Sequence, residues 1–165
     1  MSTYRLKNLL MPRSVALVGA SSRQGSVGRA ILGNIRKANF QGQFGLVNPL
    51  HREIDGFATV ARLDQLPFVP ELVVITAPAR AVAGIVDEAG RLGTAGALII
   101  TAGLGHGAGS MVEATEKAAR KYGMRLVGPN CLGLMVPGAH LNASFSAHMP
   151  DCSSSSRERR DVMPP

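Results

Sequence analysis

The sequence predicts an α/β fold, a doubly wound, Rossmann-like parallel sheet of five or more strands. Short, continuous apolar runs alternate with longer segments whose apolar residues recur at helical spacing. The first apolar run leads directly into a Gly- and Ser-rich turn, and a helical pattern follows that turn. Continuously apolar strands are typical of a sheet covered by helices on both faces. We therefore expect ligands to bind at the carboxyl ends of the strands.

The apolar runs and helical patterns divide the chain into eight expected elements. Strands are expected at residues 15–18, 44–47, 72–76, 97–101 and 125–127, and helices at about 26–38, 79–92 and 110–122. Gly93 and Gly123 stand where helix C-caps belong. The segment 51–70 breaks the alternation, and we expect it to carry the chain across the sheet edge through a turn at 54–56 and a short helical piece at 63–66.

Length and composition indicate one domain over residues 1–150 and a different segment after it. Residues 151–165 contain a run of four serines and almost nothing to bury, which predicts a disordered tail. We interpret this abrupt change as a truncation or a reading-frame change in the parent gene. The two cysteines, Cys131 and Cys152, form no disulfide framework and fit a reducing cytoplasm. No apolar run of signal-peptide or membrane-helix length occurs.

The net charge of +7 raises the question of a nucleic-acid partner, which the pattern does not favour. The basic residues are scattered, and aromatic residues make up only 4% with no Trp, so stacking on bases is not expected. A positive field also suits a small polyanionic ligand. The cysteines and histidines do not cluster as metal ligands do. No catalytic residue is assigned, because His106 is expected in solvent and Cys131 has no histidine partner in the pattern.

The glycine turn, residues 19–28, is the most informative motif. A strand, a glycine-rich turn and a helix N-terminus together form an anion site, because free N–H groups and the positive end of the helix dipole meet there. The glycines at 19, 25 and 28 do not match the G-x-G-x-x-G dinucleotide fingerprint, and no Walker A lysine follows. No acid stands at the end of the second strand, where Asn48-Pro49 is found. A tight turn that binds nothing remains the alternative.

Every expected strand is followed by a distinctive short motif, and the combination of these motifs resembles one family. The blocks are Val-Gly-Ala-Ser at 18–21 with Gly25 and Gly28, Val-Asn-Pro at 47–49, Ile-Thr-Ala-Pro at 75–78, Ile-Thr-Ala-Gly at 100–103 and Gly-Pro-Asn-Cys-Leu-Gly at 128–133. Over residues 9–145 these blocks resemble the coenzyme A (CoA) binding domain of NDP-forming acyl-CoA synthetases. That family includes ADP-forming acetyl-CoA synthetases and the α subunit of succinyl-CoA synthetase.

The resemblance implies coenzyme A as the ligand and assigns roles to eleven residues. The CoA phosphates are expected at Gly19, Ser21, Ser22, Gly25 and Ser26. The adenosine and pantetheine parts are expected to be flanked by Asn48, Pro49, Thr76 and Pro78. The thiol end is expected near Asn130 and Cys131. One departure stands out, because the lysine common in the family just after Asn-Pro is replaced by Leu50 and His51.

The resemblance also implies partners that this sequence does not carry. Members of the family continue into a domain with a phosphorylated histidine and use an ATP-grasp domain or subunit. We therefore expect CoA or acyl-CoA binding without catalysis by residues 1–165 alone, with such domains on another chain. An NAD(H)-binding redox or sensing domain is the second hypothesis, and an interaction module that has lost its ligand is the third.

Overall fold

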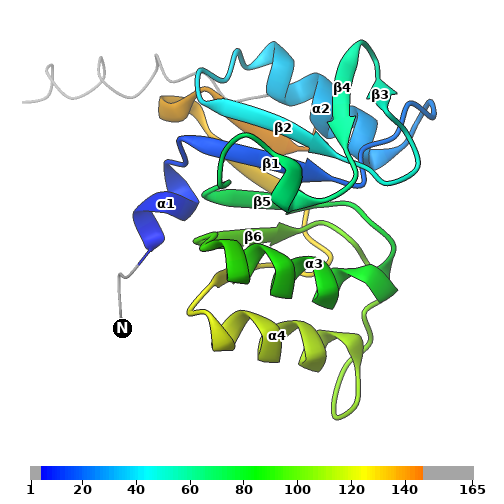
Figure 1. Ribbon diagram of the computed structural model, residues 1–165, viewed down its shortest axis with the longest axis vertical. Helices are drawn as coiled ribbons and strands as arrows, with labels where there is room; N and C mark the ends of the chain where they lie inside the picture. The colour runs from blue at the N-terminus through cyan, green and yellow to red at the C-terminus, as the bar shows by residue number, and fades with distance from the viewer. Residues whose placement is uncertain (1–4, 147–165) are drawn as a thin grey trace, which may run out of the picture.

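The computed structural model describes residues 5–146, and its centre is a seven-stranded sheet (Figure 1). The strand order is β3-β4-β2-β1-β5-β6-β7, and all neighbours are parallel except β3 and β4. The strands are β1 (Ser14–Val18), β2 (Gln43–Val47), β3 (Glu53–Ile54), β4 (Phe57–Val60), β5 (Leu72–Ile75), β6 (Gly96–Ile99) and β7 (Arg125–Val127). Counting only the parallel strands, this is the 3-2-1-4-5-6 order of a doubly wound dinucleotide-binding sheet. The predicted fold class is confirmed.

Helices cover both faces of the sheet because successive strand residues point to opposite sides. On one face, Val15 and Leu17 pack against α2 (Val27–Lys37) and against β9 (Leu141–Ser144). On the other face, Ala16 and Val18 belong to the core beneath α3 (Ala79–Leu92) and α4 (Met111–Lys121). Figure 1 shows α3 and α4 lying together on the side of the sheet away from α2. All three predicted helices are confirmed, with ends within one residue of those expected.

The segment 51–70 holds more structure than the sequence indicated. It forms the β3–β4 hairpin, and β4 extends the parallel sheet beside β2, followed by the short 3₁₀ helix η1 (Leu63–Gln65). The predicted turn and short helical piece are present, but the two strands were not expected. The hairpin is attached to α2 by an ion pair between Arg29 and Asp55 and by Arg36, whose guanidinium lies 4.8 Å from the centre of the Phe57 ring.

Two further additions lie outside the alternating pattern. The hairpin of β8 (Gly133–Val136) and β9, joined by the 3₁₀ turn η2 (Pro137–Ala139), replaces a second helix on the α2 face. Asn34 of α2 donates hydrogen bonds of 2.8 Å to the carbonyls of Ser144 and Ser146. The N-terminal helix α1 (Leu6–Leu10) buries Leu9 beside Gly96. Cys152 and the predicted tail at 151–165 lie outside the described residues.

No helix between residues 5 and 146 is both long and apolar enough to cross a lipid bilayer.

Two glycines of α3 give a matched test of the helix packing. A methyl group at Gly90 would collide with the ring of Tyr122, whereas one at Gly84 would meet nothing within 4 Å. The Tyr122 hydroxyl donates a 3.0 Å hydrogen bond to Asp87, so a displaced ring loses that contact too. We expect Gly90→Ala to lower the free energy of unfolding by about 1–3 kcal/mol and Gly84→Ala to raise it by about 0.5–1 kcal/mol. Urea denaturation followed by circular dichroism measures both, and equal effects would contradict this packing.

Candidate functional site

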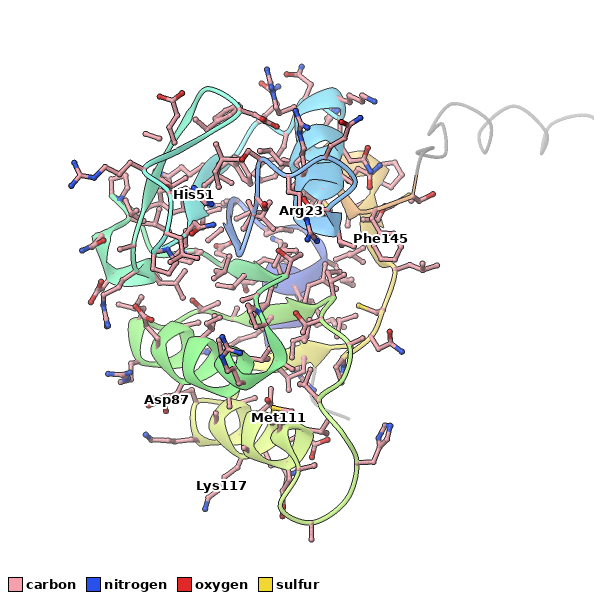
Figure 2. All side chains as sticks on the ribbon, turned by 90° about the vertical axis from the view of Figure 1, so that its right-hand side faces the viewer. Arg23, His51, Asp87, Met111, Lys117 and Phe145 are labelled. Atoms are coloured by element: carbon pink, nitrogen blue, oxygen red, sulfur yellow. The ribbon has the colours of Figure 1, made fainter. Side chains whose placement is uncertain are left out.

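The carboxyl ends of the parallel strands meet at one edge of the sheet, which faces the viewer in Figure 2. In this view Arg23 of the glycine turn lies between His51, which follows β2, and Phe145, which follows β9. The chain leaves β1 toward α2 on one face and leaves β5 toward α3 on the opposite face. This reversal of winding between neighbouring strands opens a crevice, which is where doubly wound sheets bind ligands.

Close contact between two turns fixes the shape of the crevice. Gly19 has a φ of +88°, and a Cβ atom there would lie 2.6 Å from the backbone nitrogen of Ala77. Only glycine therefore fits at this contact between the turns that follow β1 and β5. A Cβ atom at Gly28 would lie 3.0 Å from the Cα atom of Ala20, so α2 is packed directly onto the turn. These two glycines bring the start of α2 beside the start of α3.

The serines of the glycine turn shape its backbone. The Ser21 hydroxyl oxygen accepts a hydrogen bond from the Arg23 N–H at 3.1 Å. The Ser26 hydroxyl caps α2 by accepting from the Arg29 N–H at 3.3 Å. Among the described residues the backbone N–H groups of Gly25, Val27 and Gly28 have no hydrogen-bond partner. These N–H groups and the helix dipole make the start of α2 attractive to an anion.

The N-terminus of α4, at the same edge, differs because its own carboxylate occupies it. Glu113 accepts a 2.6 Å hydrogen bond from the Gly109 N–H, and Ser110 caps the helix by accepting from the Glu113 N–H. No acidic residue stands in the first turn of α2. An anionic ligand is therefore favoured at α2 over α4.

A cavity of about 370 Å³ lies at the ends of β1 and β2. Its walls are the start of the glycine turn, the turns after β2 and β5, the link from β4 to η1, and one face of α3. Asn48, only 8% exposed, donates to the Ala20 carbonyl at 2.7 Å and accepts from the Leu50 N–H at 2.7 Å. Its side chain therefore holds two walls together.

A second hollow, of about 570 Å³, lies on the other side of the turn after β5 and shares Ala77 and Pro78 with the first cavity. The Thr76 hydroxyl donates to the Val18 carbonyl at 3.1 Å. The Asn130 N–H donates to the Thr101 carbonyl at 3.1 Å. Cys131, half-buried, places its thiol 3.4 Å from the Ile99 carbonyl. The hollow is thus formed by strand ends that are bonded to one another.

The structure brings ten of the eleven predicted site residues to these hollows. Gly19, Ser21, Asn48 and Pro49 line the first cavity, Pro78 lines both, and Thr76, Asn130 and Cys131 line the second. Gly25 and Ser26 line a third, more open hollow at the start of α2. Ser22 is exposed in the glycine turn and lines none of the three. The ligand contacts of all eleven remain predictions.

Sequence reasoning missed one wall of the first cavity. Arg62 and Leu63, before and within η1, line it together with Ile85 and Glu88 of α3. These residues form no local motif, because the two segments meet only when η1 packs against α3. The one available signal was the break in alternation at 51–70. Across residues 5–146 no group of three or more His, Cys, Asp or Glu side chains could hold a metal ion.

Comparison with known proteins decides the family. Residues 13–137 match the family described as "CoA binding domain". The chain belongs to the family of CoA-binding domains. The resemblance stated from the sequence is confirmed, and nothing in the comparisons supports an NAD-binding domain.

Several relatives of this CoA-binding domain are named as ADP-forming ligases. The chain is 38% identical over 149 residues to "Acetate--CoA ligase [ADP-forming] I" of Archaeoglobus fulgidus, covering 88% of this chain and 22% of the ligase. It is 34% identical over 147 residues to the α subunit of ligase I of Pyrococcus furiosus, covering 85% of this chain and 32% of the subunit.

The solved acetyl-coenzyme A synthetase 1 of Ca. Korarchaeum cryptofilum, in complex with phosphate and ADP, superposes with a TM-score of 0.79. Its sequence identity is 33%, over 85% of this chain and 30% of that one. The chain thus spans a third or less of the length of these relatives.

The thiol of the CoA-binding domain gives a test by pH. Partial burial raises the pKa of the Cys131 thiol, and hydrogen bonds with its own loop oppose this only in part. Since the thiolate is the reactive form, we expect slow alkylation at neutral pH. We expect the rate to keep rising as the pH is raised above the ordinary cysteine pKa of about 8.5. Iodoacetamide kinetics on the Cys152→Ser variant, in which Cys131 is the single cysteine, measure this. The unfolded protein in urea is the control, and a folded-state inflection below that of the unfolded protein would contradict the assignment.

Proposed function

We propose that this domain binds CoA across the carboxyl edge of the sheet, with the diphosphate at the start of α2. Gly19 and Ser21 line the first cavity, while Val27, the first residue of α2, lines the second hollow. The N–H groups at the start of α2 therefore stand between two hollows that share Ala77 and Pro78. This arrangement carries the proposal, because CoA has an anionic centre between an adenosine end and a long pantetheine arm.

The adenosine end is assigned to the first cavity. Its lining includes the apolar residues Val18, Val47 and Ile85, which suit the faces of a purine ring. The pantetheine arm is assigned to the second hollow, where Thr76 and Pro78 lie near the start and Asn130 and Cys131 at the far side. Ser22, Gly25 and Ser26 are assigned to the phosphates from the open side of the turn, and Asn48 with Pro49 to the positioning of the adenosine walls.

The domain supplies binding and orientation of CoA, while activation of the acid lies elsewhere. Orientation of one substrate contributes to a transfer reaction only when activating groups are brought to it. Phosphoryl transfer requires charge-neutralising groups, a metal and a positioned acceptor. Residues 1–165 carry no Walker A lysine and no recognisable phosphohistidine motif. We propose that domains of those kinds, in a longer protein or on another chain, carry out activation in the manner of an ADP-forming acid–CoA ligase.

Titration calorimetry with CoA and with NAD tests the proposed function. We expect saturable binding of CoA, and binding of NAD that is weaker by at least about tenfold, or about 1.4 kcal/mol. Tighter binding of NAD would favour the redox or sensing hypothesis. Binding of neither ligand by a folded protein would favour an interaction module.

Two glycines test the position of the phosphates. Gly25 and Gly56 both have positive φ, +75° and +84°, and a Cβ atom at either would meet nothing within 4 Å. The two valine variants therefore carry similar backbone strain, but only Gly25→Val places a side chain over the start of α2. We expect Gly25→Val to weaken CoA binding at least about tenfold and Gly56→Val to leave it unchanged. Calorimetry on both variants, with their folding checked by circular dichroism, decides; equal affinities would place the phosphates elsewhere.

A further inference from the structure

The outer wall of the first cavity carries a charged group that no predicted role includes. Arg62, at the link from β4 to η1, lies between two carboxylates. Its Nε atom is 3.3 Å from an oxygen of Asp64, and its Nη2 atom is 3.4 Å from Oε1 of Glu88. Arg62 and Glu88 both line the cavity, while Asp64 does not.

Hydrogen bonds hold this wall in place. The Gln65 side chain accepts from the Ala61 N–H at 2.9 Å and the Arg62 N–H at 3.3 Å, which fixes the backbone at the base of the arginine. Glu88 accepts from the Leu63 N–H at 3.1 Å, and its side chain is only 18% exposed. The Arg62 side chain is 55% exposed by contrast. The backbone of Arg62 and the side chain of Glu88 are therefore held in place, while the guanidinium of Arg62 is accessible.

The guanidinium retains donors for a ligand. Within residues 5–146 its Nη1 atom has no hydrogen-bond partner, and the contact with Asp64 is an exposed one. Exposed ion pairs are worth little, so a doubly charged group can displace Asp64 at small cost. A planar guanidinium matches the oxygens of a phosphate in two-point contact.

The lining of the cavity holds few other basic side chains that could bind a phosphate. Arg62 and His51 are the basic side chains of its lining, and Arg52 lines the neighbouring hollow instead. CoA carries a phosphate on its ribose that dephospho-CoA and NAD lack. In doubly wound sheets that bind NADP, an arginine near the ribose accommodates the 2′-phosphate, which is a precedent for an arginine that donates to a ribose phosphate.

We propose that Arg62 is a specificity-determining residue that binds the ribose phosphate of CoA, with Glu88 as the positioning residue that orients its guanidinium. The inference rests on the proposed function, because it takes the first cavity as the adenosine site. On binding, the phosphate displaces Asp64 from the guanidinium, while the Glu88 contact is retained. Arg62 thus distinguishes CoA from ligands whose ribose is not phosphorylated.

Calorimetry with CoA and 3′-dephospho-CoA separates this inference from the proposed function. We expect the wild-type protein to bind both ligands and to prefer CoA by at least about tenfold. Arg62→Ala is expected to abolish the preference by weakening CoA alone, and Arg62→Lys to restore part of it. Glu88→Gln, which keeps an acceptor for Leu63, is expected to reduce the preference. Arg91→Ala is the matched control, because it removes an exposed, acid-paired arginine of α3 outside the cavity lining.

The outcomes are distinct. Equal wild-type affinities for the two ligands would overturn the role of Arg62 while leaving CoA binding intact. A preference that survives Arg62→Ala and disappears in His51→Ala would overturn it as well, since His51 would then bind the phosphate. Failure of the wild-type protein to bind either ligand would instead overturn the proposed function itself.

Discussion

The contact between the turns after β1 and β5 is the constraint on which the site depends. The absence of a side chain at Gly19 lets the backbone of Ala77 approach, and Gly28 lets α2 pack onto Ala20 in the same way. Two helices on opposite faces of the sheet thereby begin side by side. A Cβ atom at Gly19 would collide with the backbone of Ala77, and one at Gly28 would press on the Cα atom of Ala20, so a larger residue would disturb either contact. The crevice for an extended, centrally charged ligand is a consequence of this contact.

Hydrogen bonds between neighbouring turns make the site rigid before any ligand arrives. Asn48 joins the turn after β2 to the glycine turn, Thr76 joins β5 to β1, and Thr101 donates to the Ala77 carbonyl at 2.7 Å. These groups already form hydrogen bonds within the protein, so they contribute to binding by preorganising the site. The start of α2 and the guanidinium of Arg62 differ, because within residues 5–146 they keep donors that have no hydrogen-bond partner. Negative charge on the ligand can therefore bind at the donors that have no partner, and not at the groups that already bond within the protein.

The sequence allowed the core of the fold to be predicted because its strands are continuously apolar and its helices strongly periodic. The β3–β4 and β8–β9 hairpins were missed. β3 has only two residues, and β9 (Leu-Asn-Ala-Ser) is not an apolar run, while the apolar β8 (Gly-Leu-Met-Val) lies beyond the alternating strand and helix units. Site residues that follow a strand, such as Asn48 and Asn130, could be placed because parallel strands end at one edge. Arg62 and Glu88 could not, because their meeting depends on the packing of η1 against α3. Asn48 was expected beside the ligand, and the structure shows in addition that its amide is engaged within the protein.

The position of the diphosphate is tested most directly by the changes in backbone amide chemical shifts on titration with CoA. Amide ¹H–¹⁵N spectra report each N–H group separately, and we propose that the N–H groups of Gly25, Val27 and Gly28 donate directly to the diphosphate. Large, saturable shifts at these three residues, together with small shifts at Leu9 of α1 near the opposite end of the strands, are the predicted result. Shifts that leave the start of α2 unchanged while others saturate would contradict it.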